Sequence, residues 1–180
     1  HMADGFGRVS RKPGVCFATS GPGATNLLTG IATAQADSAP MVAVTGQVPV
    51  AMIGRDAFQE SDIIGMANPA VKYSYQPRTP EEIPQIVKQG FYIAETGRPG
   101  PVLLDIPKDV QQNEAKFTFP DEVRIPGYHP WTDPDIPSIE RAIDLLLSSE
   151  KPIILAGGGA IISSAFAELQ SIAEMLMIPV

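Results

Sequence analysis

Several features that would mark other classes of protein are rare or missing in this chain of 180 residues. Cys16 is its one cysteine, which excludes a disulfide framework or a cysteine zinc site within the chain. No run of about 18 apolar residues occurs, so no transmembrane helix is expected, and no secretory signal is visible. Charged residues make up 18% of the chain and apolar residues 44%, which favours a folded domain over long disorder. The expected compartment is the cytoplasm.

The charge balance narrows the choice of partners. The chain has 13 Lys and Arg against 20 Asp and Glu, a net charge of −7, and the basic residues form no cluster. Such a chain is a poor candidate for binding nucleic acid or an anionic membrane. Proline (18 residues) and glycine (16 residues) are abundant, and most of them stand at the ends of apolar segments, where they act as turn residues.

Short apolar runs alternate with helical patterns in the first two thirds of the chain. We predict buried strands at residues 15–19, 41–45 and 101–106 and a shorter, alternating strand at 71–75. The motif Thr79-Pro80-Glu81-Glu82 has the form of a capping box and predicts the start of an amphipathic helix. Short connections between strand and helix predict an α/β fold, a parallel sheet with helices on both faces.

The composition changes at about residue 112. Residues 113–136 are rich in proline, aspartate and aromatic residues and lack a period, so they are predicted to form a linker. Beyond them the chain predicts a helix, a strand at Ile153–Ala156, a glycine turn and a second helix. We therefore expect a first α/β domain at residues 1–112 and the start of a second, Rossmann-like α/β domain at residues 137–180.

Candidate binding residues lie in the loops that follow the predicted strands. In an open parallel sheet, ligands bind beyond the carboxyl ends of the strands, which directs attention to residues 20–26, 47–49 and 107–109. The glycines of the first loop are compatible with close approach of a ligand and equally with a tight turn. The loop matches neither the dinucleotide nor the Walker pattern. The sequence shows no spacing typical of metal ligands and no nucleophile paired with a base.

Three individual residues each allow two interpretations. Lys108 at a strand end binds an anion or is simply solvated. Arg98, in a stiff Gly-Arg-Pro-Gly loop, is a surface residue or a ligand contact. Phe58 plugs the core or lines a site.

The chain contains five distinctive segments, namely Ala18–Asn26, Thr45–Pro49, Asp56–Glu60, Gly97–Leu103 and Asp105–Asp109. Taken together, they resemble the large catalytic subunits of acetolactate synthase (acetohydroxyacid synthase), a thiamine-diphosphate enzyme of branched-chain amino-acid synthesis. The resemblance covers nearly the whole chain. The Ser-Gly-Pro-Gly loop of the first segment and the Arg-Pro-Gly-Pro-Val run of the fourth are typical of thiamine-diphosphate decarboxylases and carboligases in general, whereas Gln-Val-Pro and Ala-Phe-Gln-Glu are more specific to acetolactate synthase.

The resemblance implies a parent chain of three domains: a pyrimidine-binding domain, a middle domain that holds FAD in many members, and a diphosphate-binding domain. Residues 1–112 would then be part of the first domain and residues 137–180 the start of the second. It also implies that Mg²⁺ and the diphosphate bind in the third domain, and that the glutamate that activates the cofactor lies a few residues before His1. On this interpretation the chain is a fragment, inactive and poorly stable by itself, and no glutamate within it takes the catalytic role, Glu60 included.

The resemblance assigns roles to individual residues by their place in the motifs. One matches a contact to thiamine diphosphate, namely Gln59. Ser38 and Arg98 match residues that contact FAD, and Gly157, Gly158 and Gly159 match a turn beside FAD. Six match residues of the substrate channel, namely Gln47, Pro49, Ala57, Phe58, Lys72 and Lys108.

The implied reaction condenses pyruvate with a second 2-ketoacid, pyruvate or 2-ketobutyrate, and releases CO₂. The implied assembly is a homodimer or tetramer, because the family's cofactor lies between two subunits, and the family often includes a small regulatory subunit. Two other functions remain open. One is a related thiamine-diphosphate enzyme such as glyoxylate carboligase, pyruvate oxidase or sulfoacetaldehyde acetyltransferase, and the other is a non-catalytic binding module.

Overall fold

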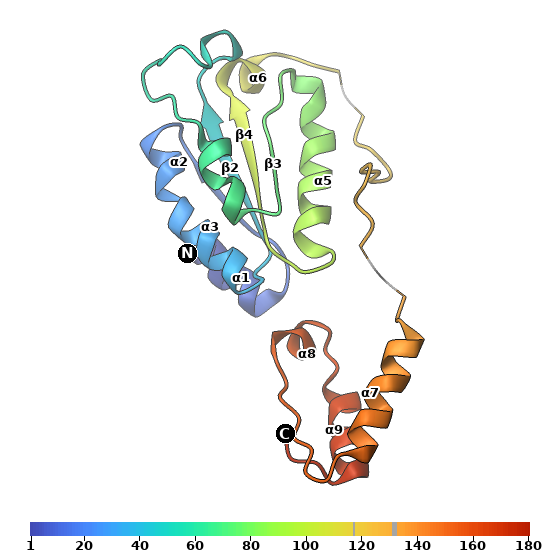
Figure 1. Ribbon diagram of the computed structural model, residues 1–180. Coiled ribbons are helices and arrows are strands. Elements are labelled where there is room, and N and C mark those ends of the chain that lie inside the picture. The colour runs from blue at the N-terminus through green and yellow to red at the C-terminus, as the bar shows by residue number, and fades with distance from the viewer. Residues whose placement is uncertain (117, 131–132) are drawn as a thin grey trace. The chain divides into compact units, whose positions relative to one another are not determined.

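A computed structural model describes residues 1–116, 118–130 and 133–180. The chain divides into two compact units, His1–Pro130 and Trp131–Val180. Figure 1 shows the sheet and its helices in the first unit and the helices α7 (Ile136–Ser148), α8 (Gly158–Ile162) and α9 (Phe166–Leu176) of the second. None of the helices in the described ranges is both long and apolar enough to cross a membrane.

The first unit is built on a parallel sheet, as the alternation of strands and helices predicts. Its described strands are β1 (Gly14–Ala18), β2 (Met41–Gln47), β3 (Tyr73–Tyr75) and β4 (Pro101–Pro107), in the spatial order β1-β2-β4-β3. All three pairings are parallel. The predicted α/β fold with a parallel sheet is therefore confirmed, and all strands end at one edge.

Helices cover both faces of this sheet (Figure 1). On one face, α1 (Met2–Ser10), α3 (Leu28–Ala36) and α4 (Ile63–Ala67) enclose a core that contains the side chains of Met41, Ala43 and Leu103. On the other face, α5 (Ile83–Glu95) packs against Val42, Val102 and Leu104. The central strand β4 is buried along its whole length, which explains its nearly continuous apolar sequence.

Helix α5 begins as its sequence predicts. The backbone N–H of Thr79 donates to the carboxylate of Glu82 at 3.0 Å, and Pro80 opens a short 3-10 turn, Pro80–Glu82, that leads into the helix. The side chains of Ile86 and Ala94 are buried against the sheet. The capping box and the amphipathic pattern therefore fix both the start and the buried face of this helix.

Helix α1 was not predicted, because Gly5 and Gly7 lower helix propensity. Its residues are held by tertiary contacts instead. A Cβ at Gly7 would collide with the carbonyl oxygen of Pro40, so glycine allows the helix to lie directly on the start of β2. Arg8 pairs with Asp4 at 2.9 Å within the helix and with Asp37 at 2.6 Å outside it. Close packing and two ion pairs thus override the intrinsic preference of the segment.

The first part of the predicted linker 113–136 packs against the first unit. Ile125 and Tyr128 contact the core beside α5, and the ammonium of Lys88 donates to the backbone carbonyls of Pro120 and Asp121. The boundary between the two compact units lies within the predicted linker, after Pro130. Residues 117, 131 and 132 of this predicted segment lie outside the described residues.

The second unit differs from the expected pattern in one respect. Its helices α7, α8 and α9 are present, but the described residues of this unit contain no strand at Ile153–Ala156. One backbone bond joins Ile154 N–H to the Pro179 carbonyl at 3.0 Å. A strand requires a ladder of such bonds, so the apolar run does not form the predicted strand. The side chain of Leu155 is 97% exposed.

Candidate functional site

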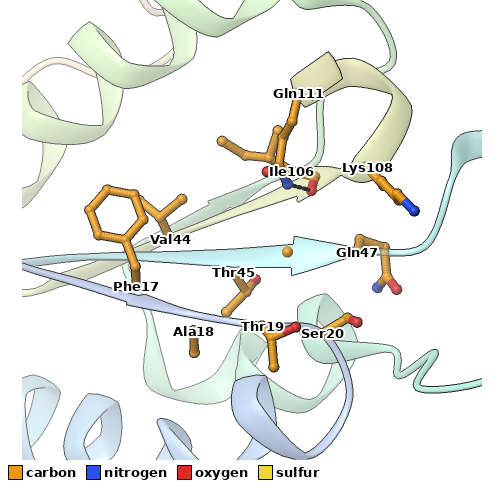
Figure 2. A pocket seen from close by; sticks show the side chains of 11 residues that line it. Phe17, Ala18, Thr19, Ser20, Val44, Thr45, Gln47, Ile106, Lys108 and Gln111 are labelled. Carbon is orange, nitrogen blue, oxygen red and sulfur yellow. Dashed lines mark hydrogen bonds between the residues drawn. The ribbon is translucent and has the colours of Figure 1, made fainter. Parts of the chain in front are cut away.

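The loops that follow β1, β2 and β4 meet at the carboxyl edge of the sheet, as the parallel topology predicts. A cavity of about 370 Å³ lies between the ends of these strands. Figure 2 shows Gln47 and Lys108 at the tip of the strands, with Thr19 and Ser20 from the loop after β1. The amide of Gln111 donates to the Ile106 carbonyl at 2.6 Å and so ties α6 (Lys108–Gln112) to the end of β4.

A buried carboxylate, Asp105, stands beneath this edge. Asp105 lies directly opposite Thr45 in the pairing of β2 with β4, and its side chain is fully buried. It accepts hydrogen bonds from the Thr45 hydroxyl at 2.6 Å, the Gln76 amide at 2.8 Å and the Gln47 amide at 3.1 Å. Burial raises the pKa of Asp105, and these donors oppose that rise by stabilising the ionised form.

The glycine loop after β1 leads into the short helix α2 (Pro22–Asn26) and approaches the loop after β2 closely. Gly21 has a φ of 60°, and a Cβ there would stand 2.8 Å from the backbone oxygen of Gln59. A Cβ at Gly23 would stand 2.7 Å from the methyl group of Thr19. The glycines are therefore required for the turn and for the close approach of Gln59.

The loop that carries Phe58 and Gln59 is braced by a carboxylate from within. Glu60 accepts hydrogen bonds from the backbone N–H groups of Gly54 and Ala57, the latter at 2.9 Å. Gln59 itself adopts a φ of 60°, in the left-handed region. The ring of Phe58 is 89% exposed, so Phe58 does not plug the core and is free to contact a ligand or a partner.

Three of the residues carried over from the resemblance lie at the opposite, amino edge of the sheet. Arg98 Nε donates to the Ser38 hydroxyl at 2.7 Å, and its Nη2 donates to the Gln35 and Ala36 carbonyls. Lys72 comes just before β3, and its backbone N–H donates to the Pro101 carbonyl at the start of β4. Ser38 and Arg98 are therefore brought together, but away from Gln59 and Lys108.

The ammonium of Lys72 is engaged by the protein. It donates to the carbonyl of Ile93 and, at 2.6 Å, to that of Thr96, and it lies 5.8 Å from the ring centre of Tyr128. Partial burial lowers the pKa of Lys72, and the Tyr128 hydroxyl opposes that shift. In the first unit Lys72 thus ties the end of α5 to the segment around Tyr128.

The remaining candidates fall into two groups. Gln47 is buried and Lys108 is exposed at the carboxyl edge, while Pro49 and Ala57 are partly buried in the loop after β2. The glycines 157–159 belong to the second unit, where Gly157 caps the N-terminus of α8. Among the described residues, no group of three or more His, Cys, Asp or Glu side chains has the arrangement of a metal site.

Two residues of the site were missed by the interpretation of the sequence. Asp105 holds the ends of three strands together, and Glu60 shapes the loop after β2. The signal for Asp105 is its position as the one charged residue in an otherwise apolar strand, Pro101–Pro107. A charged side chain in such a strand is rarely buried unless other groups hydrogen-bond to it, so its presence predicts partners. Glu60 gives no such signal, since its partners are backbone groups that only the folded loop brings near.

We predict that Glu60→Gln loosens this loop. A carboxylate accepts from both backbone donors, whereas the glutamine amide has one oxygen and presents N–H groups to the other donor. We expect exchange of the Gly54 and Ala57 amide hydrogens to become about five-fold faster, the factor that corresponds to one lost hydrogen bond. Hydrogen-exchange mass spectrometry of residues 53–60 measures this change.

The same contact has a defined pH dependence. The backbone N–H groups of Gly54 and Ala57 lower the pKa of Glu60 below its ordinary value of 4.5. A lowered pKa means that the stabilisation is complete above pH 4.5 and is lost as the pH falls through the folded-state value. Exchange in the wild type should therefore rise at acid pH relative to the intrinsic rate, while exchange in Glu60→Gln should not. Equal pH dependence in both proteins would contradict the contact.

Comparisons with known proteins agree with this geometry. Residues 1–66 match the family model described as the N-terminal TPP-binding domain of thiamine pyrophosphate enzymes. Residues 139–180 match the model of the central domain of the same enzymes. Together the two matches span more than half of the chain, and the first includes both the glycine loop and the loop with Gln59.

The whole chain is also similar to curated proteins. It is 55% identical over 183 residues to a probable acetolactate synthase large subunit of Methanocaldococcus jannaschii, and it covers 31% of that protein. It is 49% identical over 180 residues to the acetolactate synthase large subunit of Corynebacterium glutamicum, of which it covers 29%. An acetolactate synthase of Arthrospira platensis is 50% identical over 182 residues, with 31% of its length covered.

All of this chain is aligned in each case, while the chain spans about 30% of the length of these relatives. The resemblance seen in the motifs is therefore confirmed by matches that extend beyond them. The two family models, in their order along the chain, and the glycine loop at the carboxyl edge of a parallel sheet all lead to one assignment: the chain belongs to the family of thiamine pyrophosphate enzymes.

Proposed function

We propose that these 180 residues are part of a catalytic subunit with acetolactate synthase activity, which condenses two 2-ketoacids with loss of CO₂ in branched-chain amino-acid synthesis. The observation that carries this proposal is the alignment of the entire chain, at 49–55% identity, with known or probable acetolactate synthases of three organisms, two of them large subunits. The carboxyl edge of the sheet supports it. There the glycine loop meets the loop that carries Phe58 and Gln59, and Lys108 lies at the end of the neighbouring strand.

The residues at this edge fit the pyrimidine ring of thiamine diphosphate. Because Gly21 has no Cβ, the backbone of Gln59 can lie close to the glycine loop, and Phe58 presents an exposed aromatic ring. A flat heteroaromatic ring suits an aromatic face, and the amide of Gln59 supplies both a donor and an acceptor. When bound, the cofactor supplies an electron sink for the carbon atom that loses CO₂. We place Mg²⁺ and the diphosphate on a part of the full-length subunit outside these residues.

The other channel residues would act on the substrate. Lys108 is exposed at the rim, and its ammonium attracts the carboxylate of a 2-ketoacid. Phe58 and Pro49, in the loop after β2, present apolar surface that would exclude water from the reacting carbon. The chain thus contributes orientation and desolvation, while the electron chemistry belongs to the cofactor.

We further propose that FAD binds near Ser38 and Arg98 and at the glycines 157–159. In the first unit, the Arg98 guanidinium already pairs with Ser38, which holds a cation in a fixed place. In the second unit, a Cβ at any of the three glycines would meet no neighbouring residue within 4 Å, so the start of α8 is open. Flavin absorbance of the purified protein, lost on replacing Arg98 with alanine, tests this assignment.

The active form is proposed to be a cytoplasmic homodimer or tetramer, with or without a small regulatory subunit. Three apolar side chains of α1 support an interface, since Met2 is 93% exposed, Phe6 53% and Val9 88%. Light scattering of the complete protein measures the oligomeric state, and full activity in a monomer would contradict the proposal.

The activity is tested with the complete gene product that contains this sequence. We expect acetolactate from pyruvate in the presence of thiamine diphosphate and Mg²⁺, and the assay is run with and without FAD. Release of CO₂ without acetolactate would indicate a related thiamine-diphosphate enzyme instead. No turnover of any 2-ketoacid would favour a non-catalytic binding module.

Replacing Lys72 with methionine distinguishes a role in the substrate channel from a structural role within the first unit. Methionine keeps the apolar stem but removes the donor to the Ile93 and Thr96 carbonyls, which should cost about 1–2 kcal/mol of stability. Because these contacts lie at the amino edge of the sheet, we expect the KM for pyruvate to change less than about two-fold. Thermal unfolding and steady-state kinetics of the complete enzyme measure both. A large rise in KM with unchanged stability would show that Lys72 acts in the channel.

A further inference from the structure

Asp105 is the one fully buried charged side chain among the described residues of the core. Its carboxylate receives three side-chain donors: Thr45 from β2, Gln47 from the end of the same strand, and Gln76 from the chain just after β3. Hydrogen bonds to an ionised acceptor are about twice as strong as neutral ones. The carboxylate therefore connects β4 with β2 and with the end of β3, directly beneath the candidate site at the carboxyl edge of the sheet.

Gln47 transmits this connection to the site. Its Nε2 donates both to Asp105 Oδ2 at 3.1 Å and to the backbone carbonyl of Ser61 at 2.8 Å. Its Oε1 accepts from the Val48 N–H at 2.9 Å. An ionised carboxylate can only accept, so it requires the N–H₂ end of the amide and prevents the amide from turning over. The orientation of Gln47 is set by Asp105.

Ser61 in turn ends the loop that carries the candidate cofactor contacts. Gln59 stands two residues before it, in contact with Gly21 of the glycine loop. Glu60 braces the inner part of the loop, and Gln47 holds its end to the sheet. A shift of the Ser61 carbonyl would therefore move Gln59 and Phe58 relative to the glycine loop.

We propose that Asp105 is a positioning residue, which acts through Gln47 and the Ser61 carbonyl to hold Phe58 and Gln59 in place for cofactor and substrate. This proposal rests on the proposed function for its catalytic consequence. Asp105 itself does not touch the ligand. A purely structural Asp105 would stabilise the fold without affecting this loop more than other loops.

The variant Asp105→Asn tests the proposal with the least change of shape. Its single oxygen can still accept from Gln47, but the bond loses its charge, and the N–H₂ group must turn toward Thr45. The matched control is Gln76→Leu, which removes another donor to the same carboxylate oxygen and leaves Gln47 and Ser61 untouched. Both variants should lower the thermal midpoint, and only Asp105→Asn should disturb the loop.

Two measurements on the complete protein are compared. For Asp105→Asn, we expect faster hydrogen exchange at residues 57–61 and an apparent Kd for thiamine diphosphate raised about ten-fold, since small misplacements at a site have large effects. For Gln76→Leu, we expect both values to stay within about two-fold of the wild type. The double variant Asp105→Asn/Gln47→Leu should be no worse than Gln47→Leu in cofactor affinity, because both act on one path.

Equal exchange and equal cofactor affinity in Asp105→Asn and Gln76→Leu would overturn the proposal, as would additive effects in the double variant. Hydrogen exchange does not depend on turnover. If the wild type makes no acetolactate but residues 57–61 loosen only in Asp105→Asn, the proposed function fails and the positioning role stands. If the wild type is active and the loop is unchanged, the function stands and the positioning role fails.

Discussion

Replacing Gly14 with alanine is expected to destabilise the protein by about 3 kcal/mol or more. Gly14 opens β1 directly beneath α1, and a Cβ there would stand 2.7 Å from the carbonyl carbon of Ala3 and 2.8 Å from its Cα. These are backbone atoms of the helix, so they cannot rotate away as a side chain would. Either α1 must lift off the sheet or β1 must lose its pairing with β2. Urea unfolding of the complete protein, followed by far-ultraviolet circular dichroism, measures the loss.

Gly5 provides the control in the same helix. It lies inside α1, and a Cβ there would meet nothing within 4 Å. Alanine has a higher helix propensity than glycine, so Gly5→Ala should be neutral or should stabilise by about 0.5–1 kcal/mol. A Gly14→Ala protein as stable as the wild type would show that α1 does not pack on β1 as described.

Replacing Gly21 with alanine is expected to weaken binding of thiamine diphosphate by more than about ten-fold. Gly21 has a φ of 60° and a ψ of −121°, a conformation that costs an alanine about 1–3 kcal/mol, and its Cβ would also stand 2.8 Å from the Gln59 backbone oxygen. The glycine loop and the Gln59 loop must then separate, and they are the two segments proposed to hold the pyrimidine ring. Isothermal titration of the complete protein with the cofactor and Mg²⁺ measures the change.

The variant Gly127→Ala is a control that introduces backbone strain at a positive φ without a collision such as the one between a Cβ at Gly21 and Gln59. Gly127 has a φ of 78°, and a Cβ there would meet nothing within 4 Å. It lies in the segment that packs beside α5, away from the glycine loop. Its replacement should reduce stability by about 1 kcal/mol and leave the Kd for the cofactor within about two-fold. If both variants bind the cofactor equally well, the approach of Gly21 to Gln59 does not shape the site.

The sequence predicted the sheet of the first unit closely because its strands are short, apolar and separated by strong turn residues. A strand buried on both faces, such as β4, reads as a continuous apolar run whatever packs against it. The start of α5 was equally clear, since Thr79 and Glu82 cap it with local bonds. Parallel topology then required the glycine loop, Gln47 and Lys108 to lie at one edge.

Two features depended on partners that are distant in sequence. Helix α1 contains Gly5 and Gly7, which give the segment a low helix propensity. The helix is stabilised by its packing against Pro40 and by the ion pair between Arg8 and Asp37. The run Ile153–Ala156 has strong strand propensity but one backbone bond, to Pro179. Propensity depends on the residues of the segment itself, whereas backbone pairing between strands and packing against other elements depend on residues far away in the sequence.

The sequence by itself determined the α/β fold of the first unit, the family, and the edge of the sheet at which the candidate site lies. The tertiary structure alone decided how the candidates divide: Ser38, Arg98 and Lys72 lie at the amino edge, while Gln47, Gln59 and Lys108 lie with the carboxyl-edge loops. It also revealed Asp105 as the anchor beneath that edge. Motifs record which residues occur in order along the chain, but a buried carboxylate is stabilised only by donors that folding brings from other strands.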